Sequence, residues 1–148
     1  MATVKVRGLD ELSAAIDKLG DVPFSVISEA LVAMGKTGAG ILRQTGEAMG
    51  VRDPFSGVHI LDKITVRKPK QTEDGGVIYV GFSGSRKRGN TKTSNTEIAF
   101  LNEYGREGQQ ARPFVRVTAE AYPDLMAAPG EKIIGDWQEK TFADGGRS

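Results

Sequence analysis

Residues 23–49 read PFSVISEALVAMGKTGAGILRQTGEAM. Pro23 suits the first turn of a helix, because its missing N–H would find no partner there. Gly35, Gly38 and Gly40 each weaken a helix by about 1 kcal/mol relative to alanine, so they indicate a bend, a break or a close backbone crossing. The stretch still predicts one long core helix, because its apolar residues recur at helical spacing: Phe24, Ile27, Leu31, Met34, Ile41, Leu42 and Met49.

Two shorter elements are expected before this helix. Val4 and Val6 alternate with polar residues, which is typical of a short strand closed by Gly8. Residues 10–19 are expected to form a first short helix that ends near Gly20. That expectation rests on apolar residues spaced for one helical face, which are Leu12, Ala15, Ile16 and Leu19.

The long helix is followed by a loop and then by strands. Residues 50–57 are rich in turn-forming residues, which predicts a loop. Residues 64–68 alternate apolar and polar side chains, and residues 77–82 are rich in β-formers, so the two segments predict a hairpin. The fold class expected is α+β: a small antiparallel β-sheet, of about three or four strands, packed against one long helix and a C-terminal helix.

Residues 83–95 form a basic segment with no acidic residue and no aromatic residue. Glycine, serine, threonine and asparagine surround its cations, which predicts a flexible loop. Such a loop could contact phosphates or become ordered against a neighbouring subunit. Its basic residues, the candidates for a DNA-facing surface, are Arg86, Lys87, Arg88 and Lys92.

The C-terminal part predicts a second helical region. Phe114, Val117, Thr118, Ala121 and Leu125 describe one helical face. We expect an interruption at residues 129–130, which are Pro-Gly, and then a short amphipathic piece containing Trp137. Residues 143–148 are small and polar and predict a flexible tail, so residues 1–142 are expected to form a single domain.

Composition removes several classes of function. The formal net charge of +1 is too small for the whole molecule to act as a polycation. The absence of cysteine excludes disulfides, thiolate nucleophiles and thiolate metal sites. The sequence contains no apolar run of about 18 residues, so no membrane span is expected.

Two motifs suggest enzymatic chemistry only weakly. Gly35-Lys36-Thr37 resembles the end of a phosphate-binding loop, but Ala30 stands where that loop needs glycine and the region reads as a helix. His59 is the only histidine, so a hydrolase built on it stays a remote alternative. We therefore expect no catalytic residue, no cofactor and no metal, and hence a protein that is not an enzyme.

The most distinctive segments are IAFLNEYG at residues 98–105 and QARPFVR at residues 110–116. Here the chain resembles the tail-completion, or head-tail joining (neck), family of long-tailed, siphovirus-type bacteriophages and prophages. The hallmark of that family is an aromatic-rich segment ending Glu-aromatic-Gly, then an Ala-Arg-Pro-Phe turn that opens a C-terminal helix. The resemblance extends more weakly to residues 8–12, to the long helix and to residues 59–64. Residues 51–57 depart from the Pro-Val-Asp-Thr-Gly-like turn that is common in the family.

The resemblance implies a structural virion protein. Its subunits would form a ring, hexameric in that family, which completes the tail and joins it to the head. The implied partners are the tail tube, head connector or stopper proteins and, weakly, genomic DNA. The protein would assemble in the host cytoplasm and reside in the neck of the virion. The alternative is a nucleic-acid-binding module that uses the basic loop 83–95 together with Lys63, Arg67, Lys68 and Lys70.

Within the distinctive segments, some residues are candidates for contacts between subunits or with partners. Glu103 and Arg112 could pair across an interface, because an arginine fork matches a carboxylate. Pro113 fixes φ at the start of a helix, and Phe114 can hold the turn to the core, so core and turn roles compete with the interface role. The candidate interface residues are Glu103, Tyr104, Arg112, Pro113 and Phe114.

Overall fold

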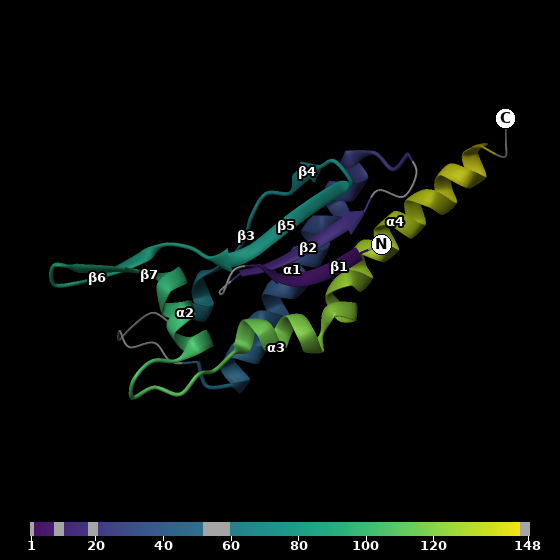
Figure 1. Ribbon diagram of the computed structural model, residues 1–148. Helices are drawn as coiled ribbons and strands as arrows, with labels where there is room; N and C mark the ends of the chain where they lie inside the picture. Colours follow the sequence, from purple (N-terminus) through teal and green to yellow (C-terminus); the bar gives the residue numbers. More distant parts are fainter. Residues whose placement is uncertain (1, 8–10, 18–20, 52–59, 146–148) are drawn as a thin grey trace.

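One uninterrupted helix, α1 (Phe24–Ala48), confirms the long helix predicted over residues 23–49. The computed structural model describes residues 2–7, 11–17, 21–51 and 60–145. Figure 1 shows α1 lying behind a β-sheet and running most of the length of the body. The fold is therefore α+β, with helices packed on an antiparallel sheet.

Both ends of α1 are closed by backbone hydrogen bonds. The Pro23 carbonyl accepts from the amides of Val26 and Ile27 at the first turn. At the other end Gly50 has φ of +69°, and the Val51 amide donates to the Gly46 carbonyl at 2.9 Å. This is the Schellman arrangement, which satisfies carbonyls that a helix end leaves without partners.

The sheet is built around one central strand, β5 (Gly75–Phe82). Its main strand order is β1-β2-β5-β3, all antiparallel, and β4 (Lys70–Thr72) also pairs with β5. The predicted hairpin of residues 64–68 and 77–82 is confirmed by the pairing of Ile64 with Phe82. The remaining elements of the sheet region are β1 (Ala2–Arg7), β2 (Glu11–Asp17), the 3-10 helix η1 (Ile60–Lys63) and β3 (Ile64–Val66).

The first short helix predicted over residues 10–19 was wrong, because β2 is a strand. Leu12, Ala14 and Ile16 alternate into the core along it. Leu12 and Ile16 are four residues apart, so their spacing fits one face of a helix as well as one face of a strand. β2 pairs with β1 on one side and with β5 on the other. Both ladders need an extended backbone, so the segment forms a strand. The strand predicted around Val4 and Val6 is confirmed as β1.

The C-terminal region forms α3 (Phe114–Ala121) and α4 (Pro123–Gly145), preceded by α2 (Asn95–Tyr104). The interruption predicted at residues 129–130 was wrong, since α4 continues through Pro129. A proline removes one helical hydrogen bond, and close packing of Gly130 against Met34 of α1 opposes that loss. Within residues 2–7, 11–17, 21–51 and 60–145, no helix is long and apolar enough to cross a membrane.

The prediction that residues 83–95 form a loop was also wrong. Residues 83–95 contain a two-stranded antiparallel ribbon of β6 (Ser85–Arg88) and β7 (Thr91–Ser94). Gly89 at the tip has φ of +61°, which suits the first central position of a two-residue hairpin turn. Figure 1 shows the ribbon projecting from the end of β5, away from the body.

Two apolar clusters form the core, and α1 joins them. One gathers around Leu42 and Phe114, and the other around Leu31 and Met34. Each of these side chains is almost fully buried. Because α1 contributes to both clusters, it links the two halves of the interior.

The glycines of α1 mark close approach rather than a bend. A Cβ added at Gly35 would lie 2.7 Å from Cγ1 of Val66 and 3.0 Å from Cδ1 of Ile78. At Gly38 it would lie 3.0 Å from Sδ of Met126. At Gly40 it would meet none of the described atoms within 4 Å. The prediction of a close crossing therefore holds for Gly35 and Gly38, and Gly40 is free of such contact.

This difference gives a matched pair of substitutions. Gly40→Ala is expected to raise the free energy of unfolding by about 0.5–1 kcal/mol through helix propensity. Gly35→Ala is expected to lower it by roughly 1–3 kcal/mol, because the new methyl group overpacks the helix against the sheet. Urea denaturation measures both, and an equal gain in the two variants would contradict the close approach at Gly35.

Candidate functional site

Glu103 lies at the centre of the turn between α2 and α3. Its side chain is buried, with the residue 2% exposed. The Glu103 Oε2 accepts from the Val115 amide at 2.8 Å and Oε1 accepts from the Arg116 amide at 3.1 Å. Pro113, the N-cap residue of α3, provides no side-chain hydrogen bond. The carboxylate of Glu103 therefore caps α3 from a distance, where the helix dipole favours negative charge.

The backbone between the two helices is folded tightly against α2. The Arg112 amide donates to the Asn102 carbonyl at 2.6 Å, and the Asn102 side chain donates to the Ile98 carbonyl at 3.0 Å. Gly105 has φ of +74°, and a Cβ there would lie 2.8 Å from the Gln109 carbonyl oxygen. Only glycine fits this position without strain.

The predicted interface residues divide into buried and surface residues. Phe114 is fully buried and packs edge-on against Phe82, with ring centroids 5.8 Å apart. Its predicted interface role was therefore wrong for this structure, and its role is in the core. Arg112 and Pro113 are half-buried. An interface role for Glu103 stays a prediction, and it would require the carboxylate to leave its buried cap.

Tyr104 is the predicted interface residue most available to a partner. It is 37% exposed and packs against Phe100, which is one helical turn earlier on α2 and equally exposed. The Arg116 guanidinium lies 5.6 Å from the centre of the Tyr104 ring, and its Nη2 donates to the Tyr104 hydroxyl at 3.4 Å. Exposed aromatic and arginine side chains of this kind are enriched at protein interfaces.

A second surface feature is an apolar groove of about 430 Å³ where α1, α3 and α4 meet. Tyr122 and Leu125, both large and exposed, contribute to it. The sequence did not identify this groove, because its walls come from separate helices. Its lining consists of Ile41, Gln44, Thr45, Ala48, Met49, Val117, Tyr122 and Leu125.

The candidate DNA-facing residues all lie on the ribbon, but not all of their side chains are exposed. Lys87 and Lys92 are exposed and directly opposite each other. The guanidinium nitrogens of Arg86 are buried, and its side chain interacts with the rest of the chain. Arg86 as a DNA-facing residue was therefore wrong, because its charged group points into the protein. Arg88 is the last residue of β6.

The base of the ribbon is tied to the start of α2. Ser94 Oγ accepts from the Glu97 amide at 3.1 Å and so caps α2. The side-chain amide of buried Asn95 donates to the Ser83 carbonyl at 2.7 Å. The Ser-x-x-Glu spacing of residues 94–97 is a helix-start signal that sequence reasoning missed.

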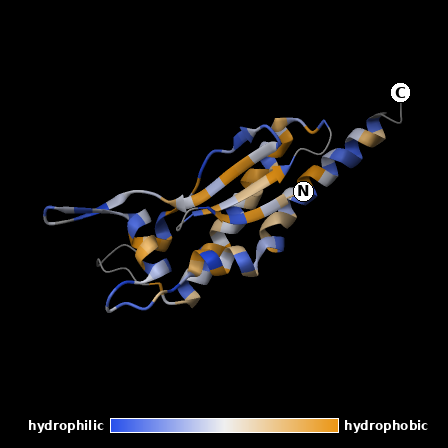
Figure 2. Ribbon diagram, in the orientation of Figure 1, coloured by the Kyte–Doolittle hydropathy of each residue, from blue (hydrophilic) through white to orange (hydrophobic). Residues whose placement is uncertain are grey.

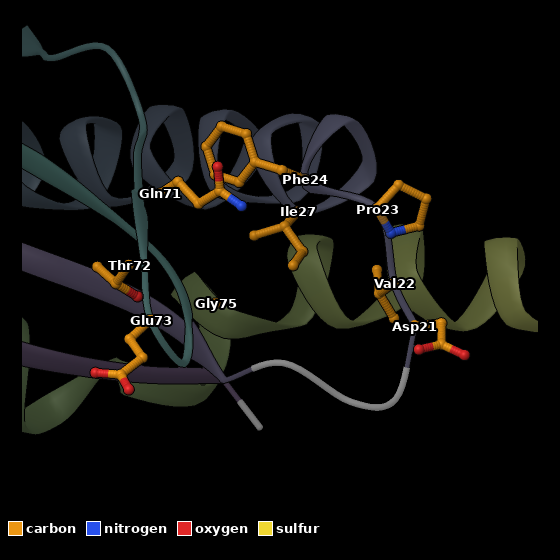
Figure 3. Close-up of a pocket in the computed structure, with 9 residues that line it drawn as sticks. All are labelled: Asp21, Val22, Pro23, Phe24, Ile27, Gln71, Thr72, Glu73 and Gly75. Carbon is orange, nitrogen blue, oxygen red and sulfur yellow. The ribbon is translucent and has the colours of Figure 1, made fainter.

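A smaller pocket of about 260 Å³ lies beside the start of α1. Figure 3 shows the carboxylates of Asp21 and Glu73 on opposite sides of it, with Phe24 and Ile27 between them. Across the described ranges, no three His, Cys, Asp or Glu residues lie together in a way that could hold a metal ion. We assign the pocket no chemistry. His59 and the loop from residue 52 lie outside the described residues.

The comparisons with known proteins give no relative for this chain: no family model, no curated protein and no solved structure matches it.

The role of Glu103 can be tested by stability. Glu103→Ala is expected to lower the free energy of unfolding by roughly 2–4 kcal/mol, because two amides of α3 lose a charged acceptor. Glu107→Ala is the control, since Glu107 is exposed in the same turn, and a surface change of this kind stays within about 0.5 kcal/mol. Equal unfolding midpoints in urea for the two variants would rule out the cap.

Proposed function

We propose that this chain is a structural subunit of a long-tailed bacteriophage or prophage. In this proposal, copies form a ring, hexameric by the resemblance, at the head-tail interface. The ring completes the tail and joins the tail tube to the head connector or stopper proteins. The likeness of residues 98–116 to the tail-completion family supports the identity of the assembly. Support for the ring comes from the surface of the chain itself.

The observation that carries the ring is the separation of two apolar features along α4. Leu125, at the groove, is 59% exposed, and Phe142, near the other end of the helix, is 86% exposed. At about 1.5 Å per residue, a straight helix holds them roughly 25 Å apart. Phe142 therefore cannot reach the groove of its own chain.

The end of α4 projects away from the body in Figure 1. Along it, Lys132 donates to Asp136 at 2.8 Å, and this hydrogen bond raises the pKa of the lysine. An exposed aromatic side chain at one end and an apolar groove at the other form a head-to-tail pair of surfaces. Repeated head-to-tail contact closes into a ring when the rotation between copies is suitable.

Substitutions that introduce a negative charge at the two features test this contact. Phe142→Glu and Leu125→Glu are each expected to weaken self-association at least about tenfold, because each places a carboxylate in an apolar contact. Light scattering over a range of protein concentrations measures the effect. Both side chains are exposed, so the unfolding midpoint should not change.

A control and a mixing experiment make the test specific. Ala143→Glu adds the same charge at the neighbouring exposed position and should assemble as the original chain does. An equal mixture of Phe142→Glu and Leu125→Glu retains one intact pair of surfaces, so it should form heterodimers but no rings. If both single variants assemble normally, the head-to-tail contact is wrong.

The biological role has its own test. In a phage or prophage that carries this gene, its deletion is expected to leave filled heads beside unattached tails in electron micrographs. A plasmid copy with Ala143→Glu should restore complete particles, and a copy with Phe142→Glu should not. Normal virions after deletion would end the proposal of a joining role.

A further inference from the structure

Lys87 and Lys92 stand directly opposite each other across the β6–β7 ribbon. Both are exposed, and residues 83–95 contain no acidic residue that could neutralise them. Like charges directly opposite each other destabilise an antiparallel pair. The ribbon therefore keeps an unfavourable pair that a bound anion would relieve.

The two lysines lie on the face of the ribbon that points away from the protein. Opposed residues share a face, and successive residues alternate between faces. The register places Lys87 and Lys92 on one face, and Arg86 and Thr93 on the other. Because the Arg86 guanidinium is buried and Thr93 is half-buried, that second face is the inner one.

The ribbon is polar along its whole length, as the hydrophilic colours of Figure 2 show. An isolated two-stranded hairpin is only marginally stable in water. Here its base is held by the Asn95 amide, which donates to the Gly84 carbonyl at 3.0 Å, and by the Ser94 cap on α2. The result is a narrow cationic projection with a fixed base.

We propose that the β6–β7 ribbon binds duplex DNA by entering the major groove, with Lys87 and Lys92 on the phosphates. The major groove is about 12 Å wide and admits a two-stranded β-ribbon. Ser85, which is on the same face as the two lysines, and Asn90 at the tip are exposed, and their side chains are further donors to phosphate oxygens. This inference concerns the single chain and does not depend on ring formation.

Duplex DNA fits the ribbon better than an acidic protein surface does. Protein interfaces usually bury an apolar centre, and β6 and β7 carry no apolar residue. Binding to DNA phosphates is instead driven by charge and the release of counterions. The polarity and the charge of the ribbon therefore agree on one class of partner.

The test measures the affinity of the full chain for a labelled B-form DNA duplex by fluorescence anisotropy at several salt concentrations. Lys87→Gln combined with Lys92→Gln should weaken binding roughly 10- to 100-fold at 0.1 M salt and reduce the salt slope by about 2. Lys92→Glu should also weaken binding, although it creates a favourable cross-strand pair and so stabilises the ribbon. A loss of binding in that variant cannot result from unfolding of the ribbon.

Two controls separate the ribbon from general charge effects. Lys36→Gln combined with Lys140→Gln removes the same charge from exposed positions on α1 and α4 and should leave the affinity unchanged. Duplex RNA of the same sequence has a deep, narrow major groove, so it should bind more weakly than the DNA. Equal affinity for the two duplexes, or equal effects of the two double variants, would overturn the inference. Binding to an acidic protein surface without affinity for the DNA duplex would also overturn it.

Discussion

The fold depends on how closely α1 can approach the elements around it. Gly35 brings the helix against the sheet at Val66 and Ile78, and Gly38 brings it against Met126 of α4. Gly130 of α4 also lies against α1, at Met34. Because α1 contributes to both apolar clusters, these short distances fix the sheet and the C-terminal helix relative to one another. Larger residues at the crossing points would separate the layers of the core.

Residues 98–116 serve mainly to build the fold. Glu103 caps α3, Gly105 allows the chain to turn, and Phe114 fills the core. Their residue types are therefore explained without a partner. The surface next to these residues is exposed. There Tyr104 and Arg116 remain accessible and contact each other. Recognition by other molecules would fall to such exposed neighbours and not to the motif itself.

The sequence predicted those elements in which the spacing of apolar residues fits only one type of secondary structure. It predicted α1 and the β3–β5 hairpin. It did not predict the strand β2, because the spacing of Leu12 and Ile16 fits a helix as well as a strand. Pairing with neighbouring strands is what makes this segment extended. The ribbon has no apolar alternation to reveal its strands. Glu103 was selected by its motif, but its burial depends on how the turn folds, which no local pattern contains. The groove was unpredictable for the same reason, since it exists only after three helices meet.

The ribbon continues directly from β5, which is hydrogen-bonded to strands on both of its sides. A pull on β6 is therefore transmitted into the central strand, whereas a pull on β7 is transmitted into α2. The hydrogen bonds of a ladder run across the strands, so a pull on β6 loads many of them at once instead of opening them one by one. A sheet loaded in shear resists extension far better than one that is peeled from an edge. The ribbon is therefore joined to the strand that is hydrogen-bonded along both of its edges.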